Sequence, residues 1–134
     1  MTDLEKAKEM ENKKGFIKYN GYKVIEAERG VKVVMEVDLT EDALNPYGFA
    51  HGGLIFGLGD TAMGVLSKST DKNAVTLSST ISYLRPTVGS KAKAVAEIVK
   101  DGKKTCYLKC DIYDDKDRLT AVMDANYYYI EEEK

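Results

Sequence analysis

The chain has 134 residues, of which 43% are apolar and 31% are charged, and its 20 basic and 22 acidic side chains give a net charge of −2 at pH 7. This length corresponds to about one domain, so we expect a single globular domain over residues 1–134 rather than a disordered chain. The charge balance argues against a strongly basic nucleic-acid-binding protein. His51 is the only histidine, which argues against the common His-rich metal sites, and we expect no metal.

The ends and the cysteines predict a cytoplasmic protein. The N-terminal segment is charged from Asp3 onward and lacks the apolar stretch of a secretory signal. The longest weakly polar stretch, residues 49–66, contains five glycines as well as His51 and Asp60, so we do not expect it to span a membrane. Cys106 and Cys110 would share one face of a strand about 13 Å apart, too far for a disulfide or one metal. We therefore expect two reduced core thiols.

Hydrophobic periodicity divides the chain into two helices and six strands. Thr2 and Glu5 match a capping box, and apolar residues recur at helical spacing after each expected helix start. The strand segments alternate apolar and polar residues, and Asp101-Gly102 is typical of a hairpin turn. In chain order we expect a helix within residues 1–14, strands at 22–28 and 31–39, a loop at 40–49, a helix at 51–68, strands at 75–83, 92–98, 106–112 and 119–130, and a frayed end at 131–134.

This order contains no repeated strand–helix–strand unit, which argues against a doubly wound sheet. It predicts an α+β fold in which an antiparallel sheet packs one face against the long helix. In the strand at 75–83, alternation places four apolar residues on one face and the hydroxyl residues on the other: Val75, Leu77, Ile81 and Tyr83 against Thr76, Ser78, Thr80 and Ser82. The second face of the sheet keeps several apolar residues, which predicts a partner subunit: Val95, Val99, Tyr107 and Tyr113.

The segment from Asn45 to Asp60 carries the residues most relevant to chemistry. His51-Gly52-Gly53 lies where the loop becomes the long helix, and the first backbone N–H groups of a helix lack partners at the positive end of its dipole. Glycine lets a ligand approach that backbone closely, as an oxyanion hole requires. Asp60 places a carboxylate inside an otherwise weakly polar helix.

Helix geometry separates His51 from Asp60. The nine positions between them correspond to about 900° of rotation and about 13.5 Å of rise, so the two side chains point to opposite sides of the helix. If both serve one site, they meet most simply across a two-fold interface, which gives two sites per dimer.

The spacing of Asn45, His51-Gly52-Gly53 and Asp60-Thr61-Ala62 resembles the phenylacetic-acid-degradation (PaaI-type) branch of the hotdog-fold acyl-CoA thioesterases. Residues 81–86, with the sequence ISYLRP, are similar to the segment that closes the following strand in that branch. The resemblance covers about residues 15–130. It implies one hotdog domain, in which an antiparallel β-sheet wraps around a long central α-helix, and it implies a homodimer or homotetramer with active sites at the subunit interface.

The same resemblance implies hydrolysis of a small aryl- or acyl-CoA thioester to a free acid and coenzyme A, without a cofactor. Asp60 would activate water as a general base or attack the thioester itself, and the Gly52 N–H would polarise the thioester carbonyl. His51 would orient that turn or the thioester. Asn45 would hold the water or the substrate, and Thr76 would assist with its hydroxyl.

Further residues are candidates for substrate binding. Gly53, Phe56 and Arg85 are the residues that we expect to contact the substrate. The segment from Arg85 to Lys104 contains six basic and two acidic residues. This positive net charge suits the phosphates of coenzyme A or, equally, a solvated strand edge.

Several of these residues also have a purely structural interpretation. His51 and Asn45 are also ordinary residues of a helix start and a turn, and Asp60 would also suit an ion pair with a lysine across an interface. Two other functions stay open. One is a non-catalytic acyl-CoA-binding or regulatory hotdog module, and the other is a hotdog dehydratase or hydratase with His51 as acid and base. No G-x-S-x-G motif is present, which argues against a serine hydrolase.

Overall fold

The computed structural model describes residues 1–13 and 15–130, so the frayed end expected at residues 131–134 lies outside the described part. In chain order the elements are α1 (Asp3–Glu11), α2 (Phe16–Tyr19), β1 (Lys23–Glu28), β2 (Lys32–Asp38), the 3-10 turn η1 (Glu41–Ala43), α3 (Gly52–Lys68), β3 (Asn73–Tyr83), β4 (Lys91–Asp101), β5 (Thr105–Asp114) and β6 (Leu119–Ile130). Within the described ranges, no helix is both long and apolar enough to cross a membrane.

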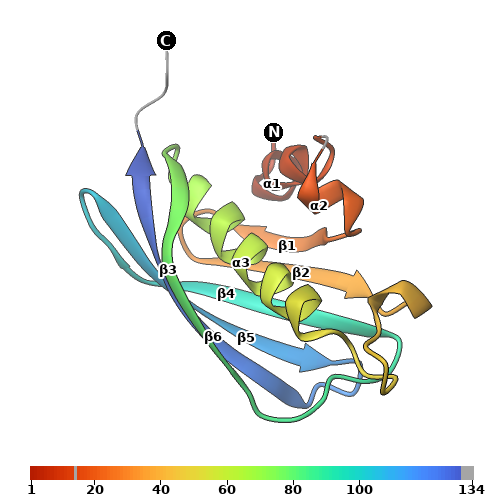
Figure 1. Cartoon of the computed structure of the whole chain (residues 1–134). Helices are drawn as coiled ribbons and strands as arrows, with labels where there is room; N and C mark the ends of the chain where they lie inside the picture. The colour runs from red at the N-terminus through yellow and green to blue at the C-terminus, as the bar shows by residue number, and fades with distance from the viewer. Residues whose placement is uncertain (14, 131–134) are drawn as a thin grey trace.

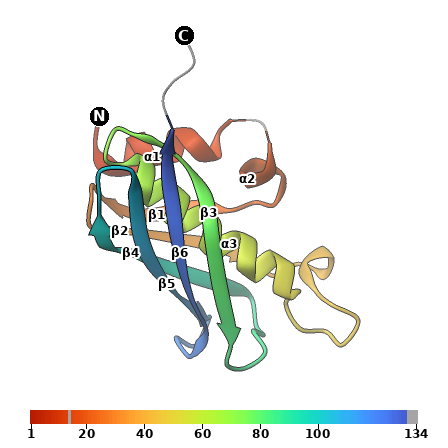
Figure 2. The same cartoon turned by 60° about the vertical axis from the view of Figure 1, so that its left-hand side comes forward.

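The six strands form one sheet in the order β1-β2-β4-β5-β6-β3, and every neighbouring pair is antiparallel. The sheet curls around α3, which lies along its concave face (Figure 1). A view turned by 60° shows α1 and α2 at one end of the sheet, beyond β1 (Figure 2). This arrangement confirms the predicted α+β fold with an antiparallel sheet around a long central helix.

The core forms where the apolar stripe of α3 meets the sheet. Leu58 and Leu66 of α3 have no exposed surface, and they belong to one buried cluster with the inward residues of the strands. In β4 those inward residues are alanines at positions 92, 94 and 96, and such short side chains permit a close approach of the helix. Cys106 and Cys110 lie on the inward face of β5 as buried free thiols, as predicted.

The N-terminal segment contains two helices instead of the single one expected. The predicted capping box is present, because Glu5 N donates to Thr2 Oγ1 at 3.1 Å and Thr2 N donates to Glu5 Oε1 at 3.2 Å. Helix α1 ends at Glu11, and the short α2 follows Gly15, whose φ of 129° favours glycine. No residue of α1 is buried. Leu4, Ala7 and Met10 are partly buried against the core, and polar contacts add to this attachment, including a bond from Val24 N to Glu11 Oε2 at 2.6 Å.

A β-bulge in β3 corrects the predicted alternation of that strand. Thr76 pairs with Tyr127 and Ser78 with Asn126, so Leu77 is the extra residue. Such an insertion reverses the faces of the side chains beyond it. The expected apolar face of Val75, Leu77, Ile81 and Tyr83 is therefore wrong. Val75 and Leu77 are 48% and 63% exposed, whereas Ile81 packs against the core.

Two glycines of α3 give opposite expectations for substitution by alanine. A Cβ at Gly57 would overlap the Tyr22 hydroxyl, which donates to Leu54 O at 2.8 Å. A Cβ at Gly64 would meet the Tyr127 ring at an ordinary 3.5 Å. We expect Gly64→Ala to raise the free energy of unfolding by about 0.5–1 kcal/mol through helix propensity. Gly57→Ala should lower it by about 1–2 kcal/mol, because overpacking and the lost hydrogen bond outweigh that gain.

Urea unfolding of both variants measures these differences. A gain of stability in Gly57→Ala would contradict the close approach of Tyr22 to the helix.

Candidate active site

The start of α3 is organised by the His51 side chain. His51 is the N-cap residue, and its Nδ1 accepts a hydrogen bond from Gly53 N at 2.9 Å. Gly52 N–H, by contrast, has no acceptor among residues 1–13 and 15–130. The Tyr83 hydroxyl donates to Gly52 O at 2.6 Å and ties this turn to the end of β3. One backbone donor is thus left free at the positive end of the helix dipole.

Asn45 shapes the loop that leads to this turn. Its Oδ1 accepts hydrogen bonds from Tyr47 N at 2.9 Å and from Phe49 N at 3.1 Å. The backbone N–H of Asn45 donates to Phe49 O at 2.7 Å. The side-chain oxygen therefore acts as an Asx-type turn acceptor. This is the structural interpretation of Asn45, and its role toward water or substrate stays a prediction.

The carboxylate of Asp60 is held through one of its two oxygens. Thr76 Oγ1 donates to Asp60 Oδ1 at 2.8 Å, and the Tyr127 hydroxyl donates to the same oxygen at 2.6 Å and to Asp60 O. The other oxygen, Oδ2, makes no hydrogen bond or ion pair with a residue that the structure describes. Thr76, which the resemblance names as an assisting hydroxyl, thus contacts Asp60, its catalytic role stays a prediction, and Oδ2 keeps its lone pairs available.

Tyr127 is not among the site residues predicted from the sequence. Its side chain is only 2% exposed. Burial, together with the nearby Asp60 charge, raises the pKa of Tyr127 above its ordinary value, so the hydroxyl stays protonated and remains a donor near neutral pH. The alternation of apolar residues along β6 would have indicated that Tyr127 is buried, but not that it contacts α3.

A cavity of about 300 Å³ opens beside this carboxylate. Asp60, Thr76 and Tyr127 provide its polar groups, and the remaining wall is made of apolar side chains and small residues from α1, α2, α3 and β3: Met10, Ile17, Thr61, Gly64, Val65, Ala74 and Val75. The cavity therefore places an oriented carboxylate next to an apolar space.

The predicted site residues fall into two groups along α3. His51, Gly52 and Gly53 lie at its start, whereas Asp60 meets Thr76 in its middle. The eight positions from Gly52 to Asp60 correspond to about 12 Å of helix, so one chain does not bring the two groups together.

Phe56 and Arg85 lie outside the Asp60 cavity. Phe56 is partly buried on α3 between the two groups. Arg85 is exposed just after β3, and its backbone N–H donates to Thr120 O at 3.3 Å. In the part of the chain that the structure describes, no three His, Cys, Asp or Glu side chains gather as a metal site would require.

Comparison with known proteins points to one family. Residues 47–121 match the model of the thioesterase superfamily. The chain is 31% identical to the acyl-coenzyme A thioesterase PaaI of Escherichia coli, over 76% of this chain and 73% of that protein. The structure of the E. coli PaaI protein superposes with a TM-score of 0.88 at 26% identity, covering 97% of both chains. A Streptococcus mutans protein crystallised with acetyl-CoA gives a TM-score of 0.77 at 31% identity, covering 84% of this chain and 91% of that one.

Substitution of His51 separates its capping role from a chemical role. His51→Ala removes the acceptor for Gly53 N–H, and we expect the free energy of unfolding to fall by about 1 kcal/mol. His51→Ser replaces the acceptor with a hydroxyl of good capping propensity and should stay within a few tenths of a kcal/mol of the parent. Urea unfolding measures both, and equal losses would contradict the capping role.

Proposed function

Because the chain belongs to the thioesterase superfamily, we propose that it hydrolyses a small aryl- or acyl-CoA thioester to the free acid and coenzyme A. The Asp60 carboxylate carries this proposal, since Thr76 and Tyr127 hold Oδ1 while Oδ2 remains available beside an apolar cavity. The E. coli relative is named an acyl-CoA thioesterase, and the S. mutans neighbour holds acetyl-CoA. Both names support a CoA thioester as the substrate.

Asp60 supplies the base or the nucleophile through Oδ2. As a base, it takes a proton from water while the water oxygen forms a bond to the thioester carbonyl carbon. The tetrahedral intermediate then collapses, the C–S bond breaks, and coenzyme A leaves as a thiolate that takes up a proton. If Oδ2 itself attacks the carbonyl carbon, the C–S bond breaks to leave the thiolate and a mixed anhydride with Asp60, and water then hydrolyses that anhydride to the free acid. A thiolate is a good leaving group, so the reaction needs no strong acid and, in this proposal, no cofactor.

The start of α3 stabilises the oxyanion in this scheme. The free Gly52 N–H lies at the positive end of the helix dipole, which suits negative charge that develops on the carbonyl oxygen. His51 orients this turn through Gly53 N. Asn45 positions water or substrate, and Gly53, Phe56 and Arg85 contact the substrate.

A second copy of the chain completes the site. Gly52 and Asp60 are separated along one helix, so we propose that Gly52 of one protomer faces Asp60 of its partner in a symmetric dimer. The edge strand β3 supports a partner there, because it is the last strand of the sheet and exposes Val75 and Leu77.

A tetramer would use the outer face of the sheet. On that face Val99 is 54% exposed, and Val95, Tyr107 and Tyr113 are partly exposed. We place the enzyme in the cytoplasm, where the free thiols Cys106 and Cys110 stay reduced.

Asp60→Asn tests the proposed chemistry. The substitution keeps the shape of the side chain but removes the base and nucleophile, so kcat should fall at least about 100-fold. Release of free thiol from a panel of aryl- and aliphatic acyl-CoA thioesters measures it. Tyr127→Phe keeps the carboxylate and removes one donor, and its kcat should fall by only about tenfold.

Three outcomes would contradict this proposal. Binding of the thioesters without turnover would favour the regulatory module. Full activity of Asp60→Asn would remove Asp60 from the chemistry. Loss of activity only in His51→Ala, with Asp60→Asn still active, would overturn the roles assigned to Asp60 and His51.

Complementation tests the shared site. Gly52→Pro removes the free N–H at the first helical position, which suits the φ of proline, although its Cβ would lie 3.1 Å from the exposed Tyr83 hydroxyl and require that side chain to shift slightly. Asp60→Asn removes the carboxylate. Each variant alone should be inactive. Random co-assembly of equal amounts should restore about one quarter of the wild-type rate, because half of the dimers then contain one intact site of two. A monodisperse monomer with full activity, or no recovery on co-assembly, would contradict the shared site.

A further inference from the structure

A larger cavity continues from the Asp60 cavity along α3. It has a volume of about 1170 Å³ and lies between α1, the end of α3, the start of β3 and the β4–β5 connection. Met10 and Val65 line both cavities, so the two spaces adjoin at these side chains. We propose that lysines at the far end of this larger cavity bind the phosphates of coenzyme A: Lys68, Lys72, Lys103 and Lys104. This inference rests on the proposed thioesterase function and names part of its substrate site.

Two elements lead from Asp60 to these lysines. Along α3 the distance from Asp60 to Lys68 corresponds to about 12 Å of helix. Along β6, Tyr127 contacts Asp60, and Tyr129 lies two residues, or about 7 Å, further on. Lys72 Nζ lies 4.4 Å from the centre of the Tyr129 ring, and Tyr129 N donates to Lys104 O at 2.9 Å. The cations are therefore assembled by the same helix and strand that hold the carboxylate.

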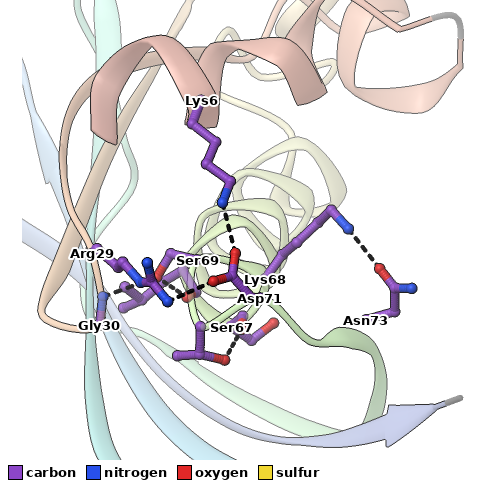
Figure 3. Close-up of polar contacts among 10 residues, drawn as sticks. Lys6, Arg29, Gly30, Ser67, Lys68, Ser69, Asp71 and Asn73 are labelled. Carbon is purple, nitrogen blue, oxygen red and sulfur yellow. Dashed lines mark hydrogen bonds and ion pairs between the residues drawn. The ribbon is translucent and has the colours of Figure 1, made fainter. Parts of the chain in front are cut away.

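Two of the basic residues that line the cavity are paired with a carboxylate. Lys6 and Arg29 both pair with Asp71, at 2.6 and 2.5 Å, and are thereby neutralised in part (Figure 3). The hydrogen bond from Lys6 and the Arg29 charge lower the pKa of Asp71. The other carboxylates of the cavity belong to α1 and β1 and form no ion pair with a described residue: Asp3, which accepts a hydrogen bond from Arg29 N at 2.9 Å, Glu9 and Glu28.

The lysines of the far end have few competing partners. Lys68 Nζ donates to Asn73 Oδ1 at 2.5 Å, which fixes its ammonium at the end of α3 (Figure 3). Lys103 and Lys104 are exposed, and neither forms an ion pair with a residue described by the structure. Three lysines of this group, Lys72, Lys103 and Lys104, therefore carry no carboxylate partner within the described part of the chain.

This arrangement matches the order of chemical groups in an acyl-CoA. The thioester lies at Asp60, the uncharged pantetheine arm passes Met10 and Val65, and the anionic nucleotide reaches the lysines. Lysine ammonium groups bind phosphate oxygens through charge-assisted hydrogen bonds. An apolar acyl chain in the larger cavity would instead meet exposed ammonium groups that it cannot pair.

Thioesters of one acyl group on three carriers test the phosphate site. The carriers are coenzyme A, pantetheine and N-acetylcysteamine, of which only coenzyme A has phosphates. In Lys103→Ser/Lys104→Ser the KM for the CoA thioester should rise about tenfold, because two charged contacts are lost. Its kcat, and the KM values for the other two thioesters, should not change. The control Lys109→Ser/Lys116→Ser removes the same charge from exposed positions that do not line the cavity, and it should leave all KM values unchanged.

The outcomes separate this inference from the proposed function. Equal KM increases in the two double variants, or equal increases for all three thioesters, would overturn the phosphate site while the thioesterase function stands. If the wild-type protein hydrolyses none of the thioesters, the proposed function fails. Titration calorimetry with coenzyme A then still tests whether the lysines bind its phosphates. Affinity weakened about tenfold only by Lys103→Ser/Lys104→Ser supports it, and unchanged affinity or no binding refutes it.

Discussion

The position of α3 along the sheet determines where every functional group of this chain lies. Apolar burial drives the helix onto the sheet but has no direction, so burial alone does not fix the helix against sliding or rotation. Directional hydrogen bonds do so. Tyrosine hydroxyls from the residue before β1, from β3 and from β6 donate to backbone carbonyls of α3: Tyr22 to Leu54, Tyr83 to Gly52 and Tyr127 to Asp60. The free N–H at the helix start and the carboxylate in its middle are thus set relative to the strands.

The bulge at Leu77 connects the proposed catalytic carboxylate with the proposed contact to a second copy. Thr76, on the near side of the bulge, faces α3 and donates to Asp60. The same irregularity leaves Val75 and Leu77 on the exposed side of the edge strand. A regular strand would have placed Thr76 and the later inward residues Ile81 and Tyr83 on opposite faces. One inserted residue therefore serves both the orientation of the carboxylate and the apolar edge that we assign to a second copy.

Sequence periodicity was sufficient for the fold because most elements are long and regular. The last strand was predicted at residues 119–130, as it is in the structure, and the central helix begins within one residue of its predicted start. Thr76 was named as an assisting hydroxyl only through the family resemblance, and its contact with Asp60 was not predicted. Helix α2 was missed because four residues carry almost no periodic signal.

The features that the sequence did not predict depend on contacts between distant segments. Leu77 fits a regular alternation in the sequence, so nothing local marks it as a bulge. Tyr127 contacts Asp60 across 67 positions of the chain, and only the pairing of β6 with β3 brings it there. For His51, a helix cap and a catalytic group require the same location, so spacing alone did not distinguish them.

Helix α1, which lines the larger cavity, is attached to the rest of the protein less firmly than α3. Met10, which adjoins both cavities, belongs to a helix without a buried residue, and polar contacts attach that helix at Asp3, Lys6 and Glu11. Segments with few buried contacts open at a lower free energy than the sheet core. The two residues at which the cavities adjoin therefore belong to elements of different stability, because Val65 is buried in the core whereas Met10 of α1 is only partly buried against it. We therefore expect ionic strength to shift Met10 more than Val65, because salt weakens the exposed Lys6–Asp71 ion pair of α1 and leaves the core packing in place.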